Sequence, residues 1–332
     1  MDKDKVLLEV RNLVACIETG SGLVKAVDDV SFDVRKGEIV GLVGESGCGK
    51  TMTALSIMRL LPEPFGRIVG GSIYFEGQDL TKLTEEEMRA IRGNKISIIF
   101  QDPLTALNPI MKIGEQIVEA IVAHRKVDKN EAKRRAIELL HSVGIPDGEV
   151  IASQYPFRVS GGMRQRVMIA VALACDPVLL IADEPTTNLD VSIQAQILEL
   201  INEIRRKRGT SVLLITHNLG LVAWLCDRVF VMYAGKIVEH APTEALFANP
   251  YHPYTQLLLK SVPKLDSPRD KLTTVEGEVP NLIKPPSGCR FHPRCPYVKE
   301  FCRTVEPALI KVNTDHYTRC LMQDSRYSGE WK

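Results

Sequence analysis

Residues 39–52 constrain this chain more than any other stretch, because an apolar run leads there directly into a glycine-rich loop. The loop has the spacing G-x-x-x-x-G-K-[ST], with Gly44 and Gly49 at its glycine positions and Lys50 and Thr51 after them. Such a loop lets consecutive backbone N–H groups surround a phosphate while a helix begins at the lysine. An ordinary glycine-rich turn is the alternative, but the preceding apolar strand favours a nucleotide-phosphate site.

Two side chains in this stretch have specific expected roles. Lys50 is expected to reach the β- and γ-phosphates, and the Thr51 hydroxyl is expected to hold Mg²⁺. The residues predicted to contact the nucleotide here are Gly44, Glu45, Ser46, Gly47, Cys48, Gly49, Lys50, Thr51 and Met52.

Composition indicates a globular protein of roughly two domains. The chain has 332 residues, 45% of them hydrophobic, and a formal net charge of +1. This small charge gives no general electrostatic reason to expect nucleic-acid binding. The apolar runs are shorter than the roughly 18 residues that cross a bilayer, and the N-terminal residues lack the apolar region of an export signal, so we expect neither feature.

Three further apolar segments predict strands that end in polar side chains. They are 96–100 before Gln101, 178–182 before Asp183 and Glu184, and 211–216 before His217. Ligands of open α/β sheets bind beyond the carboxyl ends of the strands, so we expect these side chains to face one crevice. Asp183 suits a Mg²⁺ shell and Glu184 the polarisation of a water molecule, whereas a solvated acidic turn and a structural histidine are the alternatives.

Other patterns predict the remaining parts of the fold. Alternating apolar residues over 6–35 predict half-buried strands, and helical spacing over 102–160 predicts a helical insert. Ser160, Gly161 and Gly162 open another predicted helix, whose bare N–H groups offer a second anion site. Because the loop at Lys50 accounts for the chain's own nucleotide, we expect this second site to serve a nucleotide held by another subunit.

Together these stretches resemble the ATP-binding subunits of ABC transporters over roughly residues 6 to 250. The correspondence covers the Walker A motif at 44–51, the Q-loop glutamine Gln101, the signature VSGGM at 159–163, the Walker B motif LLIADE at 179–184 and the switch histidine His217. QDPLTALNPIMKIGEQI at 101–117 and YHPYTQLLLKSVP at 251–263 are similar to the dipeptide/oligopeptide permease branch.

The resemblance implies an α/β fold with a P-loop NTPase core, an antiparallel β subdomain, a helical signature subdomain and a loop-rich C-terminal cysteine tail. The expected domains are an ABC ATPase domain at 1–262 and the tail at 263–332. Two ATP molecules are expected between two such subunits, each contacted by one chain's Walker A motif and the other chain's signature.

The implied activity is ATP hydrolysis that powers import of di- or oligopeptides through a membrane-embedded permease. By resemblance Glu184 is the base, His217 contacts the γ-phosphate, Lys50 stabilises charge, and Gln101 joins Thr51 and Asp183 at Mg²⁺. The implied partners are a second ATPase subunit, usually a paralogue in this branch, two transmembrane permease subunits and an extracytoplasmic solute-binding protein. The expected location is peripheral, at the cytoplasmic face of the cell membrane.

Two alternatives to peptide import remain open at this point. Similar systems carry nickel or other small solutes. A soluble ABC ATPase that acts on nucleic acid or ribosomes is an alternative of another class, for which a locally basic tail is the candidate binding element. The basic residues of that tail are Arg290, Arg294, Arg303 and Arg319.

The C-terminal tail is rich in proline and cysteine and has few periodic apolar segments, so we expect it to need a stabilising group. Four thiolates suit an iron–sulfur cluster, and the spacings C-x₅-C and C-x₆-C are longer than the short pairs of most zinc sites. Some members of the permease branch bind a [4Fe–4S] cluster, which is therefore the predicted cofactor beside ATP and Mg²⁺; zinc and unmetallated thiols are the alternatives. The predicted ligands are Cys289, Cys295, Cys302 and Cys320.

Overall fold

The structure is a computed structural model that describes residues 5–187, 189–261 and 276–331. The chain divides into two compact units, each built from separate stretches of sequence. Among the described residues, the helical unit contains 5–6, 34–38, 82–187 and 189–214, and the phosphate-loop unit contains 7–33, 39–81, 215–261 and 276–331. The predicted boundary between residues 262 and 263 lies outside the described residues.

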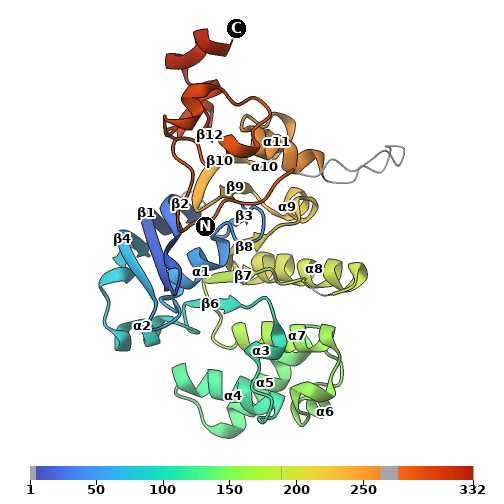
Figure 1. Cartoon of the computed structure of the whole chain (residues 1–332). Helices are drawn as coiled ribbons and strands as arrows, with labels where there is room; N and C mark the ends of the chain where they lie inside the picture. Colours follow the sequence, from blue (N-terminus) through green and yellow to red (C-terminus); the bar gives the residue numbers. More distant parts are fainter. Residues whose placement is uncertain (1–4, 188, 262–275, 332) are drawn as a thin grey trace. The chain divides into compact units, whose positions relative to one another are not determined.

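One sheet of the phosphate-loop unit has the strand order β2-β1-β4-β5 (Figure 1). These strands are β1 (Val6–Thr19), β2 (Gly22–Arg35), β4 (Gly66–Phe75) and β5 (Gln78–Asp79). β1 and β4 pair antiparallel, with Leu8 opposite Phe75, and both side chains are buried. The predicted antiparallel subdomain is therefore confirmed.

The second sheet contributes the strand order β11-β12-β10-β9-β3 to the same unit. Its strands are β3 (Ile39–Val43), β9 (Arg228–Tyr233), β10 (Lys236–Pro242), β11 (Ile310–Asn313) and β12 (His316–Thr318). β3 runs parallel to β9, and all five of its residues are buried, which explains its continuous apolar sequence.

Four α-helices accompany these strands within the described part of the unit. They are α1 (Lys50–Met58), α9 (Leu219–Leu225), α10 (Thr243–Ala248) and α11 (Pro253–Lys260). α1 ends at Met58, because Arg59 adopts a left-handed conformation (φ 49°) and its N–H donates to the carbonyls of Leu55 and Ser56.

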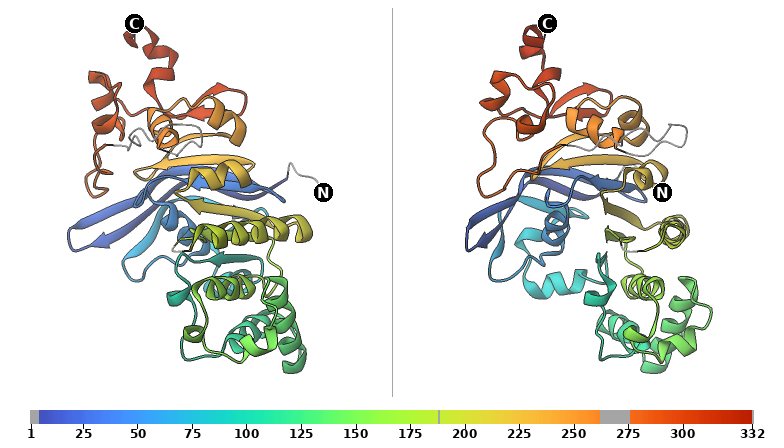
Figure 2. Two further views of the ribbon diagram at one scale, coloured as in Figure 1. Left: turned by 90° about the vertical axis from the view of Figure 1, so that its right-hand side faces the viewer. Right: turned by 45° about the vertical axis from the view of Figure 1, so that its right-hand side comes forward.

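The helical unit contains the strand order β8-β7-β6 and most of the helices (Figures 1 and 2). Its strands are β6 (Ile96–Ile99), β7 (Leu179–Asp183) and β8 (Ser211–Thr216). Its helices are α2 (Glu85–Ile91), α3 (Pro103–Ala106), α4 (Ile113–His124), α5 (Lys129–Ser142), α6 (Gly148–Ala152), α7 (Gly161–Ala172) and α8 (Val191–Arg208).

Side-chain caps fix where several of these helices begin. Thr84 and Glu87 form a capping box at α2, Asp128 accepts from two backbone N–H groups at α5, and Asp190 accepts from Ile193 N–H at α8. The backbone hydrogen bonds lower the pKa of both aspartates, so these caps are fully charged at neutral pH. Residues 102–160, over which a helical insert is predicted, contain α3, α4, α5 and α6.

The C-terminal segment 276–331 is attached by strand pairing and packing, against the expectation that it needs a metal to fold. β12 pairs with β10, with Glu239 opposite Thr318 and His240 opposite Tyr317. Phe291 is 1% exposed, and its ring centroid lies 5.1 Å from that of Tyr233. The segment thus extends a sheet that already exists, which offsets the entropy of ordering a proline-rich chain. Figure 2 shows it beside β10 and α11 in both views.

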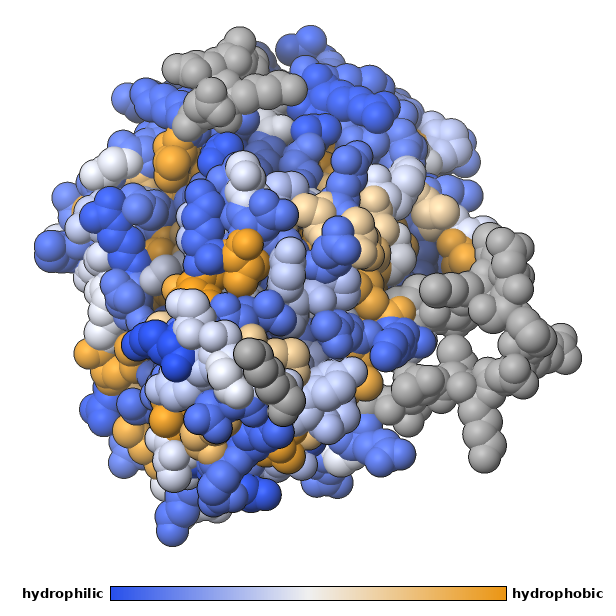
Figure 3. Space-filling model, turned by 90° about the horizontal axis from the view of Figure 1, so that it is seen from above, coloured by the Kyte–Doolittle hydropathy of each residue, from blue (hydrophilic) through white to orange (hydrophobic). Residues whose placement is uncertain are grey.

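No helix among the described residues has the length and apolar character needed to span a bilayer. On the face drawn in Figure 3, hydrophilic residues predominate and hydrophobic residues gather in small separate groups.

Glu239 is the buried centre of the C-terminal attachment. Its carboxylate accepts hydrogen bonds from the backbone N–H groups of Tyr251 (2.6 Å) and His252 (3.0 Å), and it lies 2.8 Å from Nε2 of His316. Glu239 is fully buried, so each of these groups loses its partner if the carboxylate is removed.

We expect Glu239→Ala to lower the free energy of unfolding by about 3 kcal/mol or more, because it leaves the buried His252 N–H and His316 ring and the partly buried Tyr251 N–H without their partner. Urea denaturation of the full chain gives this value, and limited proteolysis should locate the new cleavages within residues 276–331. The control is Glu278→Ala, which removes an exposed glutamate from the same segment. Equal stability of the two variants would contradict a central role for Glu239.

Candidate functional site

The phosphate loop lies between the end of β3 and the start of α1. Lys50 is 5% exposed, and its Nζ donates to the carbonyl oxygens of Gly44 (2.8 Å) and Glu45 (2.9 Å). The ammonium group is therefore folded over the loop's own backbone. Thr51, the predicted Mg²⁺ ligand, is exposed in the first turn of α1.

Two glycines allow the loop to pass close to neighbouring strands. Gly44 has φ 155° and Gly49 has φ 108°, and a Cβ at either position would lie 2.1 Å from a backbone carbonyl oxygen, that of Met232 or of Ala26. Gly49 is also the N-cap of α1 and has no side chain to occupy the helix terminus. Consequently the backbone N–H groups and positive dipole end of α1 are available to an anion.

Gln101 and Glu184 meet in the helical unit, as expected from their places at strand ends. Gln101 Nε2 donates to Glu184 Oε2 at 3.0 Å, and the Thr187 hydroxyl donates to the same oxygen at 3.0 Å. Glu184 has φ 47°, an uncommon conformation for a non-glycine residue. Asp183 is the last residue of β7 and is 2% exposed.

Ser160 opens α7 in the helical unit. Its hydroxyl accepts a hydrogen bond from Met163 N–H (3.3 Å), so it is the N-cap. A Cβ at Gly161 would meet no atom within 4 Å, whereas one at Gly162 would contact Ile193. The first turn of α7 therefore has open space at Gly161, as a site for an external anion requires.

His217 belongs to the phosphate-loop unit and follows the last residue of β8 directly. It is exposed, and the next residue, Asn218, caps α9 by accepting from the N–H groups of Gly220 and Leu221. The predicted site residues thus fall into two groups. The loop and His217 are in the phosphate-loop unit, and Gln101, Asp183, Glu184 and Ser160 to Gly162 are in the helical unit.

The predicted iron–sulfur cluster and its zinc alternative are wrong. All eight cysteines are free, and Cys289, Cys295, Cys302 and Cys320 line one small cavity beside Phe291. However, in the part of the chain that the structure describes, no group of three or more Cys, His, Asp or Glu side chains could hold a metal ion.

Burial determines the protonation state of two of these thiols. It raises the pKa of Cys289 to about 11 and that of Cys320 to about 12, so both are protonated at neutral pH. The four side chains therefore contribute to packing of the C-terminal segment, whose attachment comes from β12, Phe291 and Glu239.

Sequence reasoning missed the residues of the C-terminal half that contact the phosphate loop. Arg294 forms a bidentate ion pair with Glu45, and the Tyr254 hydroxyl accepts from Glu45 N–H at 2.9 Å. The available signal was the cluster of tail arginines, which we interpreted as a possible nucleic-acid contact. Arg290 and Arg319 instead form ion pairs with Asp28 and Asp29, so these charges are neutralised within the fold.

A phosphate loop after a buried parallel strand, with a lysine over its backbone, defines the class of P-loop nucleotide-binding ATPases. The family described as ABC transporter matches residues 27–187, and the family described as Oligopeptide/dipeptide transporter, C-terminal region, matches residues 238–302. This chain therefore belongs to the ABC transporter family of ATP-binding proteins, in the oligopeptide/dipeptide transporter branch, and is an ATP-hydrolysing cassette.

Similar proteins are known over nearly the whole length. The chain is 51% identical over 318 residues to the oligopeptide transport ATP-binding protein AppD of Bacillus subtilis (strain 168), covering 96% of this chain and 97% of AppD. It is 51% identical over 320 residues to the dipeptide transport ATP-binding protein DppD of the same organism, covering 96% of each. Both likenesses confirm the resemblance inferred from the motifs.

The fold is also similar to that of a solved ATP-binding cassette. The dimeric post-hydrolysis structure of the cassette MJ0796 bound to ADP and Pi has a TM-score of 0.65 and 25% identity, and the match covers 71% of this chain and 99% of that one. This likeness confirms the predicted cassette fold.

The contrast between two loop glycines tests the geometry of the phosphate loop. Gly49→Ala should lower the free energy of unfolding by at least about 2 kcal/mol more than Gly47→Ala, because only the first places a Cβ against backbone. Gly47 has φ 77° but no atom within 4 Å of an added Cβ, so its variant controls for backbone strain alone. Thermal unfolding without nucleotide measures both, and equal losses would contradict the close approach.

Proposed function

We propose that this chain is the ATP-hydrolysing subunit of an importer for dipeptides or oligopeptides. The observation that carries the proposal is one chain containing both the phosphate loop at Lys50 and the C-terminal region matched at 238–302. The names of relatives that align over 96% of the chain, oligopeptide and dipeptide transport ATP-binding proteins, support the choice of solute.

The phosphate loop and Lys50 are the proposed phosphate-binding elements. The lysine is already held over the loop by two carbonyl oxygens, so it can exchange these partners for phosphate oxygens with little rearrangement. The oxygen atoms of Thr51, Asp183 and Gln101 are donors of the kind that Mg²⁺ prefers, and we assign the metal to these residues. When bound, Mg²⁺ neutralises charge on the transferred phosphoryl group.

Glu184 is the proposed general base. The hydrogen bonds from Gln101 and Thr187 fix one of its carboxylate oxygens, which orients the group to accept a proton from the attacking water. His217 is the proposed contact to the γ-phosphate. Its place directly after β8, with Asn218 capping α9, gives its backbone a defined position.

The first turn of α7 supports a role in a second nucleotide site. Ser160, Gly161 and Gly162 present backbone N–H groups at a helix N-terminus with open space at Gly161. We assign this turn to the nucleotide of a second ATPase subunit, a paralogue of this chain, which has the reciprocal arrangement.

Exposed apolar side chains support docking to membrane partners. Leu104 is 57% exposed and Ile110 is 85% exposed, and both lie within residues 101–117, the segment similar to the permease branch. We assign this surface to one of two transmembrane permease subunits, which operate with an extracytoplasmic solute-binding protein. The chain is then peripheral, on the cytoplasmic face of the membrane.

Glu184→Gln tests the proposed base. In the assembled complex we expect phosphate release to fall at least about 100-fold while ATP remains bound, because the amide keeps the shape but cannot accept the proton. Retention of labelled ATP on the purified complex gives the second readout. The control is Glu203→Gln, which removes an exposed carboxylate from α8 that pairs with Lys207. Turnover at the wild-type rate in Glu184→Gln would rule Glu184 out as the base.

Solute uptake tests the proposed transport function. Cells that lack this chain but contain its partner subunits should accumulate a labelled dipeptide or pentapeptide only when the wild-type chain is restored. Lys50→Ala should not restore uptake, because it removes the charge that contacts the phosphates in both ground and transition states. If the cells accumulated Ni²⁺ but no peptide, the transported solute would be the metal rather than peptides.

A further inference from the structure

One short part of the C-terminal segment, Cys289 to Arg294, contacts the phosphate loop although it lies more than 200 positions later in the sequence. The Arg294 side chain is 4% exposed, and its two terminal nitrogens donate to the two carboxylate oxygens of Glu45 at 2.7 and 2.9 Å. Bidentate arginine–carboxylate pairs are both strong and directional. The rotamer of Glu45, the residue directly after Gly44, is therefore fixed from outside the loop.

The backbone of the same loop residue is fixed by a second group. Glu45 N–H donates to the Tyr254 hydroxyl at 2.9 Å, and burial raises the pKa of Tyr254 far above its ordinary value, so this hydroxyl stays neutral. Tyr254 packs against Tyr233 and Phe291, with ring centroids 4.6 and 5.4 Å away. Phe291 is three residues before Arg294, so one aromatic cluster supports both contacts to Glu45.

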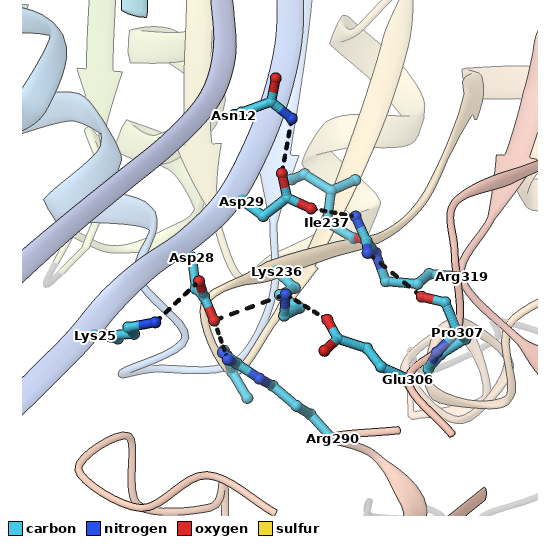
Figure 4. A network of polar contacts seen from close by, with 11 residues as sticks. Asn12, Lys25, Asp28, Asp29, Lys236, Ile237, Arg290, Glu306, Pro307 and Arg319 are labelled. Carbon is cyan, nitrogen blue, oxygen red and sulfur yellow. Dashed lines mark hydrogen bonds and ion pairs between the residues drawn. The ribbon is translucent and has the colours of Figure 1, made fainter. Parts of the chain in front are cut away.

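A second arginine attaches the same segment through a network of polar contacts around Asp28 and Lys236 (Figure 4). Arg290 donates to the Ala234 carbonyl and pairs with Asp28, and Lys236 bridges Asp28 (3.7 Å) and Glu306 (2.6 Å).

The β9–β10 turn joins this network to the loop itself. Gly235 N–H donates to the Cys48 carbonyl of the phosphate loop at 2.8 Å. The segment at Arg290 and Arg294 thus contacts the loop directly and also supports the turn that holds it.

We propose that Arg294 is a positioning residue for ATP, which neutralises Glu45 and holds its carboxylate away from the bound phosphates. The reason is electrostatic: Glu45 puts a negative charge into a loop whose task is to bind a polyanion, and like charges in such a site repel. This inference rests on the proposed function of the loop as the ATP site. It makes the C-terminal segment part of the nucleotide site.

Nucleotide affinity tests this role in the full chain. With Mg·ATP as the ligand in equilibrium titrations, Arg294→Ala should raise the dissociation constant about 10-fold, in line with loss of a bidentate charged pair. Arg294→Lys keeps the positive charge but cannot form the bidentate pair, so its dissociation constant should lie between those of wild type and Arg294→Ala. The matched control is Arg303→Ala, which removes an exposed arginine of the same segment that pairs with Glu300 at 3.6 Å.

The double variant separates neutralisation from a merely structural role. If Arg294 acts by neutralising Glu45, Glu45→Gln combined with Arg294→Ala should return affinity to within about 3-fold of wild type, because the repelling charge is gone. A double variant as weak as Arg294→Ala, or an Arg294→Ala variant as tight as wild type, overturns the proposal.

The Lys50→Ala variant separates a failure of the Arg294 proposal from a failure of the proposed ATP site. A wild-type chain that binds Mg·ATP and loses it in Lys50→Ala supports the ATP site whatever the result at Arg294. A wild-type chain that does not bind Mg·ATP overturns both.

Hydrogen exchange measures the reverse effect, that of bound ATP on the C-terminal segment. Because coupling is reciprocal, ATP should slow exchange in peptides covering residues 289–294 of the wild-type chain and leave them unchanged in Arg294→Ala. Equal protection by ATP in both proteins would contradict the coupling.

Discussion

The close approach of backbone to backbone at the phosphate loop is the constraint on which the rest of the structure depends. A Cβ at Gly44 would collide with the carbonyl of Met232 on β9, and one at Gly49 with the carbonyl of Ala26 on β2. The loop therefore takes its shape from both sheets of its unit at once. Lys50 lies over the loop only because this path brings two carbonyl oxygens within hydrogen-bond distance of its Nζ.

The strands that support the loop also carry the C-terminal segment. β9 leads through the turn at Gly235 into β10, and β12 pairs with β10, so the segment is a continuation of the sheet that begins at β3. Its arginines then reach back to Asp28 and Glu45. Partly buried ion pairs such as these need accurate geometry to stabilise a fold, and a rigid sheet edge supplies it. The same strands therefore support both the C-terminal segment and the nucleotide site.

Much of this structure could be predicted from sequence, because local sequence patterns determine these elements. β3, the strands at 6–35, the helices of the insert and the helix after Ser160 follow from apolar periodicity, glycine spacing and caps. The meeting of Gln101 and Glu184 followed from their places at neighbouring strand ends. The C-terminal segment could not be predicted in this way. Its few apolar residues suggested a missing core and a metal, whereas β12 and Phe291 use a core supplied by residues 228–254.

The sequence by itself determined the class of protein and the parts of its site, since a phosphate loop, its strand and its helix are contiguous and need no other segment to be recognised. Only the tertiary structure decided what surrounds that loop. Glu45 and Arg294 are 249 positions apart, and nothing in their local sequence marks them as a pair. Contacts of this kind depend on how strands far apart in the chain align in one sheet, which is a property of the folded backbone rather than of any local pattern.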